Sequence, residues 1–247
     1  MNCLSTGSAN ITITGAYNDV TYNETISISV ELTSTDNYNY ISVQDAISAN
    51  VNDIVTVKGI VGPSLVNKDG FYLIDDTGVV AVLMDTAVID TLEIGHEVIL
   101  KGSRDHFTKG GDSYYGQTCI TNCEVVVNNY GSHDYSTATF DNSITLADFY
   151  NLDPKVDYST SVYILKATVE IVETNYYTNI QLTDGSTKVS LYCSSANQYS
   201  WLKAYAGQEV TLEIAPCNWN SKNYYRGCVL AVYTEDGKVV NELNFMD

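Results

Sequence analysis

The chain is poor in cations, which narrows the class of partner that it can bind. It has only 3 Pro, which is compatible with a fold rich in β-strands. Its 247 residues include 12 Lys and Arg against 30 Asp and Glu, which gives a formal net charge of -18. A field of this sign repels phosphate backbones, so a neutral or cationic partner is favoured over nucleic acid. The acidic residues are spread along the chain, without an acidic tail or a basic arm.

Long apolar runs are missing as well. No stretch reaches the roughly eighteen apolar residues of a membrane-spanning helix, and the opening "MNCLSTGSAN" lacks the basic start and apolar run of a signal peptide. We therefore expect no membrane span in this chain, and we place any export signal or anchor outside the sequence given.

The six cysteines and three histidines follow no metal-binding pattern. There is no Cys-x-x-Cys and no His-x-x-x-His, so neither a structural zinc nor a cofactor is expected. Cys217 and Cys228 flank the segment "NWNSKNYYRG" and could face each other across a hairpin. They are the candidate disulfide of an exported protein, the alternative being two small apolar residues in a sheet.

Signatures of catalysis are also lacking. The sequence has no Gly-x-Ser-x-Gly elbow and no glycine-rich phosphate loop with a lysine, and His96, His106 and His133 lie apart along the chain. We therefore do not expect an enzyme.

What the chain does have is strand-forming residues and a repeat. It contains 20 Tyr with abundant Val, Ile and Thr, a composition typical of an all-β protein. The hairpin "GFYLIDDTGVVAVLMD" (70–85) returns as "YTNIQLTDGSTKVSLYCS" (177–194), and the elements around it return in the same order. This predicts a tandem duplication of a module of roughly 100 residues.

Five strands with a short helix between the third and fourth is the element order of the OB-fold, a small Greek-key barrel. The predicted fold class is therefore all-β, with two tandem five-stranded OB-like Greek-key barrels and short helices, preceded by a short β-hairpin segment. The expected boundaries are 1–35 for the N-terminal strands, either a separate segment or the remnant of a preceding domain, 36–133 for the first barrel and 134–247 for the second.

The alternating apolar residues of the strands are predicted to fill the two barrel interiors. They are Val55, Val57, Ile60, Leu73, Val80, Val82, Val98 and Leu100 in the first module, and Leu165, Ala167, Val169, Ile180, Leu182, Val189, Leu191, Val210 and Leu212 in the second. Asp75, Asp76 and Asp184 are interpreted as turn residues, because the spacing of a calcium loop is missing.

The first hairpin, preceded by "VTVKGIVG" and followed by "GHEVILKGSR", resembles the OB-fold modules of exported bacterial nucleases and surface lipoproteins. The resemblance covers about residues 40–130 and, more loosely, 144–240. It implies the fold and an extracellular or cell-surface location, but it implies no particular function, because the OB barrel carries many unrelated activities.

The loops between the fourth and fifth strands are the candidate binding site, because they combine aromatic and basic side chains. The candidate ligand-binding residues are Arg104, His106, Lys109, Tyr114 and Tyr115 in the first loop, and Trp219, Lys222, Tyr224, Tyr225 and Arg226 in the second. The alternative is that these tyrosines have only a structural role and pair with side chains on the neighbouring strand.

The leading hypothesis is a monomeric, non-catalytic binding or spacer module of an exported bacterial protein, which engages a protein or glycan through these loops. The alternative is a single-stranded nucleic-acid-binding OB-fold protein, which the charge disfavours. The third hypothesis is an enzyme whose site is not recognisable in the sequence.

Overall fold

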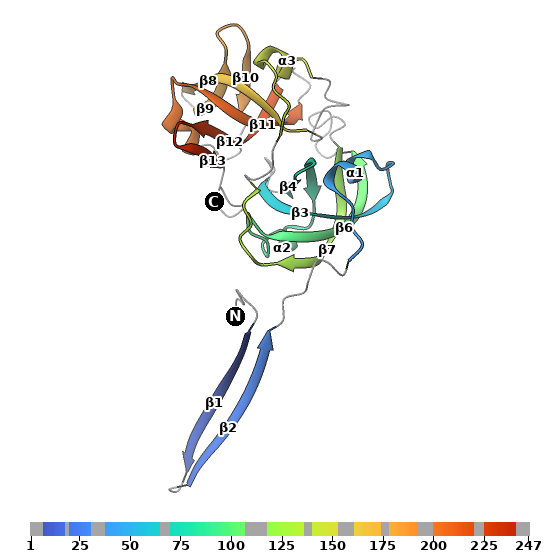
Figure 1. The fold of residues 1–247 in the computed structure, drawn as a ribbon, viewed down its shortest axis with the longest axis vertical. Helices are drawn as coiled ribbons and strands as arrows, with labels where there is room; N and C mark the ends of the chain where they lie inside the picture. Colours follow the sequence, from blue (N-terminus) through green and yellow to red (C-terminus); the bar gives the residue numbers. More distant parts are fainter. Residues whose placement is uncertain are drawn as a thin grey trace.

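Three separate β-structures follow one another along the chain (Figure 1). The computed structural model describes residues 7–17, 20–30, 38–64, 70–106, 118–135, 140–152, 161–173, 178–191, 200–219 and 225–240. A two-stranded ribbon comes first, a closed five-stranded barrel second and a six-stranded sheet third. The predicted fold class is confirmed, since strands form almost all of the regular structure and the helices are short.

Barrel 1 closes on itself in the order β3-β4-β5-β7-β6. Its strands are β3 (Ile54–Ser64), β4 (Gly70–Asp75), β5 (Gly78–Leu83), β6 (Glu97–His106) and β7 (Thr118–Asn129). All pairs are antiparallel except β5 with β7, where Ala81 lies opposite Cys119 in a parallel pair. This mixture of pairings arises because the fifth strand returns beside the third, as a Greek key requires.

Barrel 2 repeats this order. Its strands are β8 (Tyr163–Glu173), β9 (Thr178–Thr183), β10 (Lys188–Leu191), β11 (Glu209–Trp219), β12 (Tyr225–Thr234) and β13 (Gly237–Val240). A parallel pair between Ser190 on β10 and Arg226 on β12 closes the first five strands as β5 and β7 close barrel 1. Strand β13 is an addition that the sequence analysis missed, and it forms a hairpin with β12.

Short helices occupy equivalent places in the two barrels. Helices α1 (Val43–Ser48) and α3 (Leu146–Tyr150) precede the first strand of each, while α2 (Thr86–Ile89) and the 3₁₀ helix η4 (Ser200–Tyr205) lie between the third and fourth strands. Gly95 and Gly207 follow these two helices, before the fourth strand of each barrel, with φ of +90° and +76°. Their amides donate to the carbonyls of Val61 and Val169 respectively, both at 2.8 Å. The two barrels therefore correspond down to individual backbone hydrogen bonds.

Asp75 and Asp184 lie at the hairpin turns, as predicted, and their own carboxylates hold these turns. One oxygen of Asp75 accepts from the amides of Thr77 and Gly78, and the other accepts from the amide of Val43 at the start of α1. Asp184 accepts from the amides of Ser186 and Thr187, and these bonds hold the pKa of its carboxyl below the usual range. Asp75 thus also fastens α1 to the hairpin.

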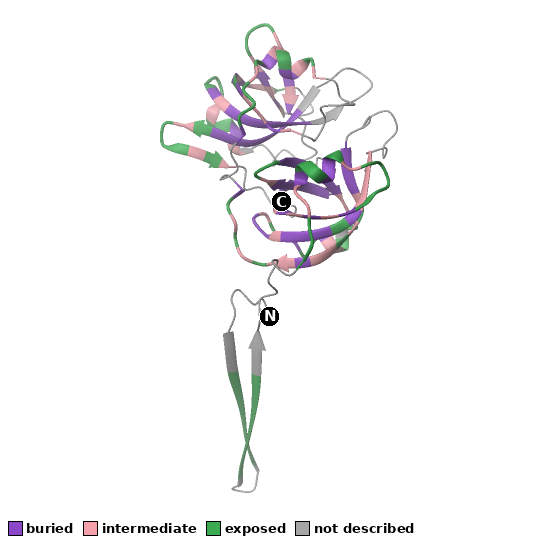
Figure 2. Cartoon of the chain, turned by 45° about the vertical axis from the view of Figure 1, so that its right-hand side comes forward, coloured by how far each residue is buried: buried purple, intermediate pink, exposed green. Residues whose placement is uncertain are grey.

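The N-terminal ribbon pairs β1 (Gly7–Tyr17) with β2 (Val20–Val30) and extends away from the barrels (Figures 1 and 2). One face is polar and bonded to itself, since Thr14 donates to Asn23 and Ser27 donates to Asn10, both at 2.8 Å. On the opposite face Ile13 is 56% exposed. Period-2 patterning thus gives the hairpin one polar and one apolar face.

Within the described ranges, no helix is long and apolar enough to cross a bilayer.

Candidate functional site

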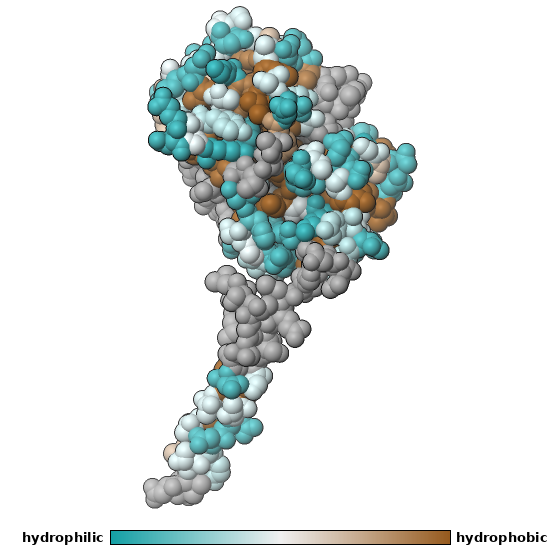
Figure 3. Space-filling view, in the orientation of Figure 1, coloured by the Kyte–Doolittle hydropathy of each residue, from teal (hydrophilic) through white to brown (hydrophobic). Residues whose placement is uncertain are grey.

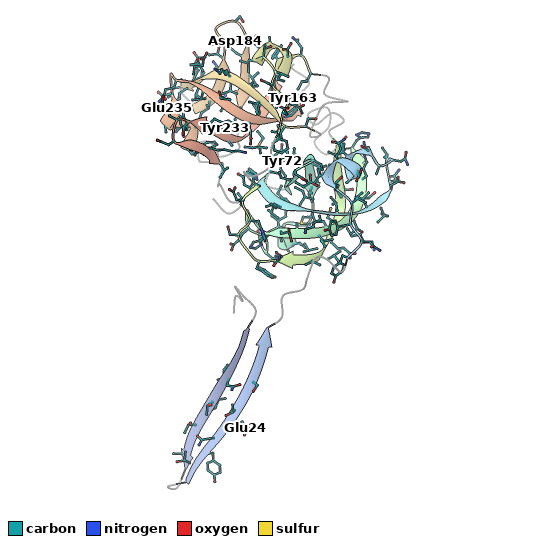
Figure 4. The ribbon with its side chains drawn as sticks, in the orientation of Figure 1. Glu24, Tyr72, Tyr163, Asp184, Tyr233 and Glu235 are labelled. Atoms are coloured by element: carbon teal, nitrogen blue, oxygen red, sulfur yellow. The ribbon has the colours of Figure 1, made fainter. Side chains whose placement is uncertain are left out.

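The outer face of β4 and β5, where OB-folds most often bind ligands, is buried in barrel 1 (Figure 2). Phe71 and Leu73 point into the barrel core, whereas Tyr72 and Ile74 pack outward into a second apolar cluster. This interface cluster consists of Tyr72, Ile74, Val79, Ala81, Cys119, Tyr135, Phe140, Val162, Ala215, Cys228 and Leu230. Figure 4 places Tyr72 where the two barrels meet.

The interface cluster joins the hairpin of barrel 1 to the outer face of β11 and β12 in barrel 2. Ile60, which we predicted to lie inside barrel 1, instead packs against this cluster and is only partly buried. The prediction was wrong because alternation along β3 places Ile60 on the face opposite Val57 and Val61. Barrel 2 therefore covers the usual ligand face of barrel 1.

The equivalent face of barrel 2 is open and polar. On β9 and β10 the inward residues, such as Leu182 and Val189, belong to the core, while Gln181, Lys188 and Ser190 point outward. Glu170 on β8 accepts from Gln181 and from Lys188, the latter at 2.9 Å, and both bonds hold the pKa of its carboxyl below the usual range. The described part of this face has no aromatic side chain on which a base could stack.

The lysines of the described residues are largely neutralised by the protein itself. Four ion pairs join Lys58 to Glu97 at 3.2 Å, Lys101 to Glu124 at 3.7 Å, Lys188 to Glu170 at 2.9 Å and Lys238 to Glu213 at 2.7 Å. A phosphate backbone binds by releasing counterions from unpaired cations. These four ammonium groups already have carboxylate partners, so they contribute little to such a groove.

The predicted loop residues are only partly described. Lys109, Tyr114, Tyr115, Lys222 and Tyr224 lie outside the described residues. Trp219, Tyr225 and Arg226 are placed by backbone alone, at the facing ends of β11 and β12.

Arg104 and His106 are brought together at the end of β6. Two nitrogens of the Arg104 guanidinium donate to the carbonyl of Ile47 at 3.3 Å, and a third lies 3.1 Å from Nε2 of His106. These contacts join the end of α1 to β6, so Arg104 has a structural role.

The strand register corrects the predicted disulfide. Cys217 lies opposite Arg226, whereas Cys228 lies opposite Ala215. The two cysteines are therefore diagonal neighbours, which typically lie about 7–8 Å apart, beyond the roughly 4.4–6.8 Å that separates the Cα atoms of a disulfide. Cys228 forms no disulfide and is buried in the interface cluster, so the Cys217–Cys228 bridge is withdrawn.

Cys119 and Cys123 of β7 are free thiols, and burial raises the pKa of both to about 12. We expect both to react with iodoacetamide at pH 8 about a thousandfold more slowly in the native protein than in urea, because only the thiolate attacks. Peptide mapping by mass spectrometry measures this ratio. Labelling of either cysteine within minutes under native conditions would contradict this burial.

Two of the distant histidines come together, which the sequence did not reveal. The amide of His133 donates to the carbonyl of Gly95 at 2.8 Å, beside His96. His96 is buried, stacks edge-on against Tyr130, and burial lowers the pKa of its imidazole. Within the described residues, no three His, Cys, Asp or Glu side chains gather closely enough to hold a metal ion.

A groove of about 550 Å³ lies on the outer face of barrel 2, over β8, β11 and β12. Its lining comes from Lys166, Tyr205, Gln208, Glu209, Val210, Thr211, Tyr233, Thr234 and Glu235. Figure 4 shows Tyr233 and Glu235 on the same side of the barrel. Thr211 lies opposite both Lys166 and Tyr233 in the strand register, so these three form one row across the sheet.

A buried carboxylate lies between this groove and the interface cluster. Glu213 is two residues beyond Thr211 on β11, and it accepts from the Tyr233 hydroxyl at 2.5 Å and pairs with Lys238 at 2.7 Å. Burial and the bond to Glu213 raise the pKa of Tyr233 to about 12. The phenol therefore remains a donor at neutral pH, and its ring is held in place at the groove.

No protein-family model matches the chain, and no curated protein matches it. Among solved structures, the p204 HINb domain is 15% identical, with a TM-score of 0.35 over 79% of this chain and 96% of that chain. The Ifi202 HINa domain in complex with 20-bp double-stranded DNA is 9% identical, with a TM-score of 0.32 over 77% and 100% of the two chains.

A chain of replication protein A bound to single-stranded DNA is 11% identical, with a TM-score of 0.25 over 83% of this chain and 72% of that one. Likenesses this distant carry no inference about the present chain. Its OB-like fold is recognised from its own strand order.

Proposed function

We propose that the chain is a non-catalytic binding module of an exported protein, which holds a neutral ligand on a rigid pair of OB-like barrels. The observation that carries this proposal is the interface cluster, which fills the outer face of β4 and β5 and joins the barrels. A ligand must then use barrel 2 or the loops, and the net charge of -18 disfavours an anionic one.

The surface supports the same proposal. Figure 3 shows hydrophilic side chains over most of the described surface in that view, with apolar colour confined to small patches. The lysines that could meet a phosphate are largely ion-paired, as described above. The loop residues predicted from the sequence, Tyr114, Tyr115, Tyr224 and Tyr225 among them, stay a prediction for an additional contact surface.

Single-stranded nucleic acid is the second candidate ligand, and one observation favours it. The outer face of β9 and β10 in barrel 2 is polar and partly exposed, and OB-folds bind oligonucleotides on this pair of strands. The face offers Lys188 as a cation, but this group is engaged by Glu170. We therefore rank this candidate below a neutral ligand.

Fluorescence anisotropy with a labelled 20-nucleotide single strand, titrated from low to physiological salt, separates the two candidates. We expect no measurable binding at physiological salt, because binding that rests on few phosphate contacts is weak and is lost as salt rises. A labelled duplex of the same length serves as a second probe. Micromolar or tighter binding of either DNA at physiological salt would contradict the proposed function and make nucleic-acid binding the better account.

A further inference from the structure

We propose that the groove over β8, β11 and β12 of barrel 2 is a glycan-binding site, an inference that rests on the proposed function. The groove lies on a different face of the barrel from β9 and β10, and it is separate from the loops between the fourth and fifth strands. It therefore adds a site to those that the fold and the sequence suggest.

The aromatic side chains of the groove come from two elements. Tyr205 belongs to η4 and Tyr233 to β12, and both line the same space. A tyrosine ring offers a flat apolar face with a polar rim, which suits the face of a sugar ring whose edge carries hydroxyls. Two such rings in an open groove fit an extended chain of sugars better than a compact ligand.

Tyr233 is preorganised for this role. Its hydroxyl is bonded to Glu213, and the ammonium of Lys238 lies 5.7 Å from the ring centroid. Glu213 is in turn ion-paired with Lys238, so the three side chains form one closed network. A ring fixed before binding loses little rotamer freedom when the ligand arrives.

The polar lining favours hydroxyl groups over charged ones. Glu209 and Glu235 can accept from sugar hydroxyls, the hydroxyl of Thr211 can donate or accept, and Lys166 can donate. Two carboxylates against one ammonium leave the groove net acidic, so phosphate, sulfate and uronate groups are repelled. The geometry and charge together favour a neutral glycan over an anionic one.

Affinity electrophoresis in native gels tests the site with defined probes. The gels contain xyloglucan, galactomannan, arabinoxylan, mixed-linkage β-glucan, glycogen or dextran, and a heparin gel serves as the anionic comparison. We expect at least one neutral polysaccharide to retard the protein more strongly than heparin does.

Single substitutions then locate the binding. Tyr233→Ala and Tyr205→Ala should each weaken the retardation by at least about tenfold, as expected for the loss of a central aromatic contact. Tyr22→Ala is the matched control, because Tyr22 is an exposed tyrosine of the ribbon rather than of the groove. Circular dichroism confirms that each variant is folded, and the two groove variants check each other if one fails to fold.

The inference is overturned if none of the neutral polysaccharides retards the protein. It is also overturned if both groove variants bind as well as the parent, or if heparin is preferred. A protein ligand would give the first of these results and would leave the proposed function standing. The DNA titration fails or succeeds independently of these gels, so the two proposals can be rejected separately.

Discussion

Replacing Ile74 with Asp should cost more than about 4 kcal/mol of unfolding free energy, because it buries an unpaired carboxylate in the interface cluster. Ile74 is 1% exposed and packs in the cluster that joins the barrels. We expect barrel 1 to lose its attachment to barrel 2 and to expose the outer face of β4 and β5. Urea unfolding followed by fluorescence gives the free energy, and dye binding reports the uncovered apolar surface.

Ile54→Asp is the matched control for this experiment. Ile54 is also an isoleucine in a strand of barrel 1, but it is 65% exposed. The same chemical change there should cost within about 1 kcal/mol. Equal losses in the two variants would mean that the outer face of β4 is not covered.

Replacing Glu213 with Ala should lower the unfolding free energy by about 3–5 kcal/mol, as is typical when one partner of a buried ion pair is removed. Glu213 is 2% exposed, and its carboxylate serves both Lys238 and the Tyr233 hydroxyl. The loss should be visible in urea unfolding at neutral pH. The Tyr233 side chain should also be less firmly fixed at the groove, because its hydroxyl loses the acceptor that Glu213 provides.

Two further variants test the cause of that loss. Glu124→Ala removes an exposed partner of Lys101 and should cost only about 0–1 kcal/mol. Glu213→Leu combined with Lys238→Met should recover much of the stability, because an apolar pair of similar volume avoids the desolvation of two charges. A single Glu213→Ala variant as stable as the parent would show that the pair contributes nothing to the fold.

The fold was predictable because local signals agreed with one another. The repeated hairpin, the glycines at 95 and 207 and the helix between the third and fourth strands all follow from turn chemistry and periodicity. Strand β13 was missed because "GKVV" has only four residues, too few for a clear period-2 pattern.

The interface between the barrels left a signal in the sequence that we did not use. In β4 and β5 the runs "GFYLI" and "GVVAVL" are continuously apolar, whereas "TNIQLT" and "KVSL" in β9 and β10 alternate with polar residues. A continuous run indicates a strand that is buried on both faces. The two copies of the hairpin therefore have different roles, one joining the barrels and the other facing solvent.

The groove had no local signal. Tyr205 and Tyr233 are far apart in the sequence, and only the pairing of β8, β11 and β12 places their elements side by side. The burial of Glu213 could not be predicted either, because nothing in the sequence distinguishes it from the other Asp and Glu residues, of which the chain has 30 in all. Such sites form only when distant strands pair in the folded barrel, and the periodicity of apolar residues does not reveal which side chains then meet.

Residual dipolar couplings of the backbone amides test most directly whether the two barrels form one rigid unit. The couplings of the strands of barrel 1 (β3 to β7) and those of barrel 2 (β8 to β13) are fitted separately in a weakly aligned sample. The interface cluster predicts that one alignment tensor fits both sets. Two tensors that differ in magnitude or orientation would mean that the barrels move independently, and that the outer face of β4 and β5 is open to ligand.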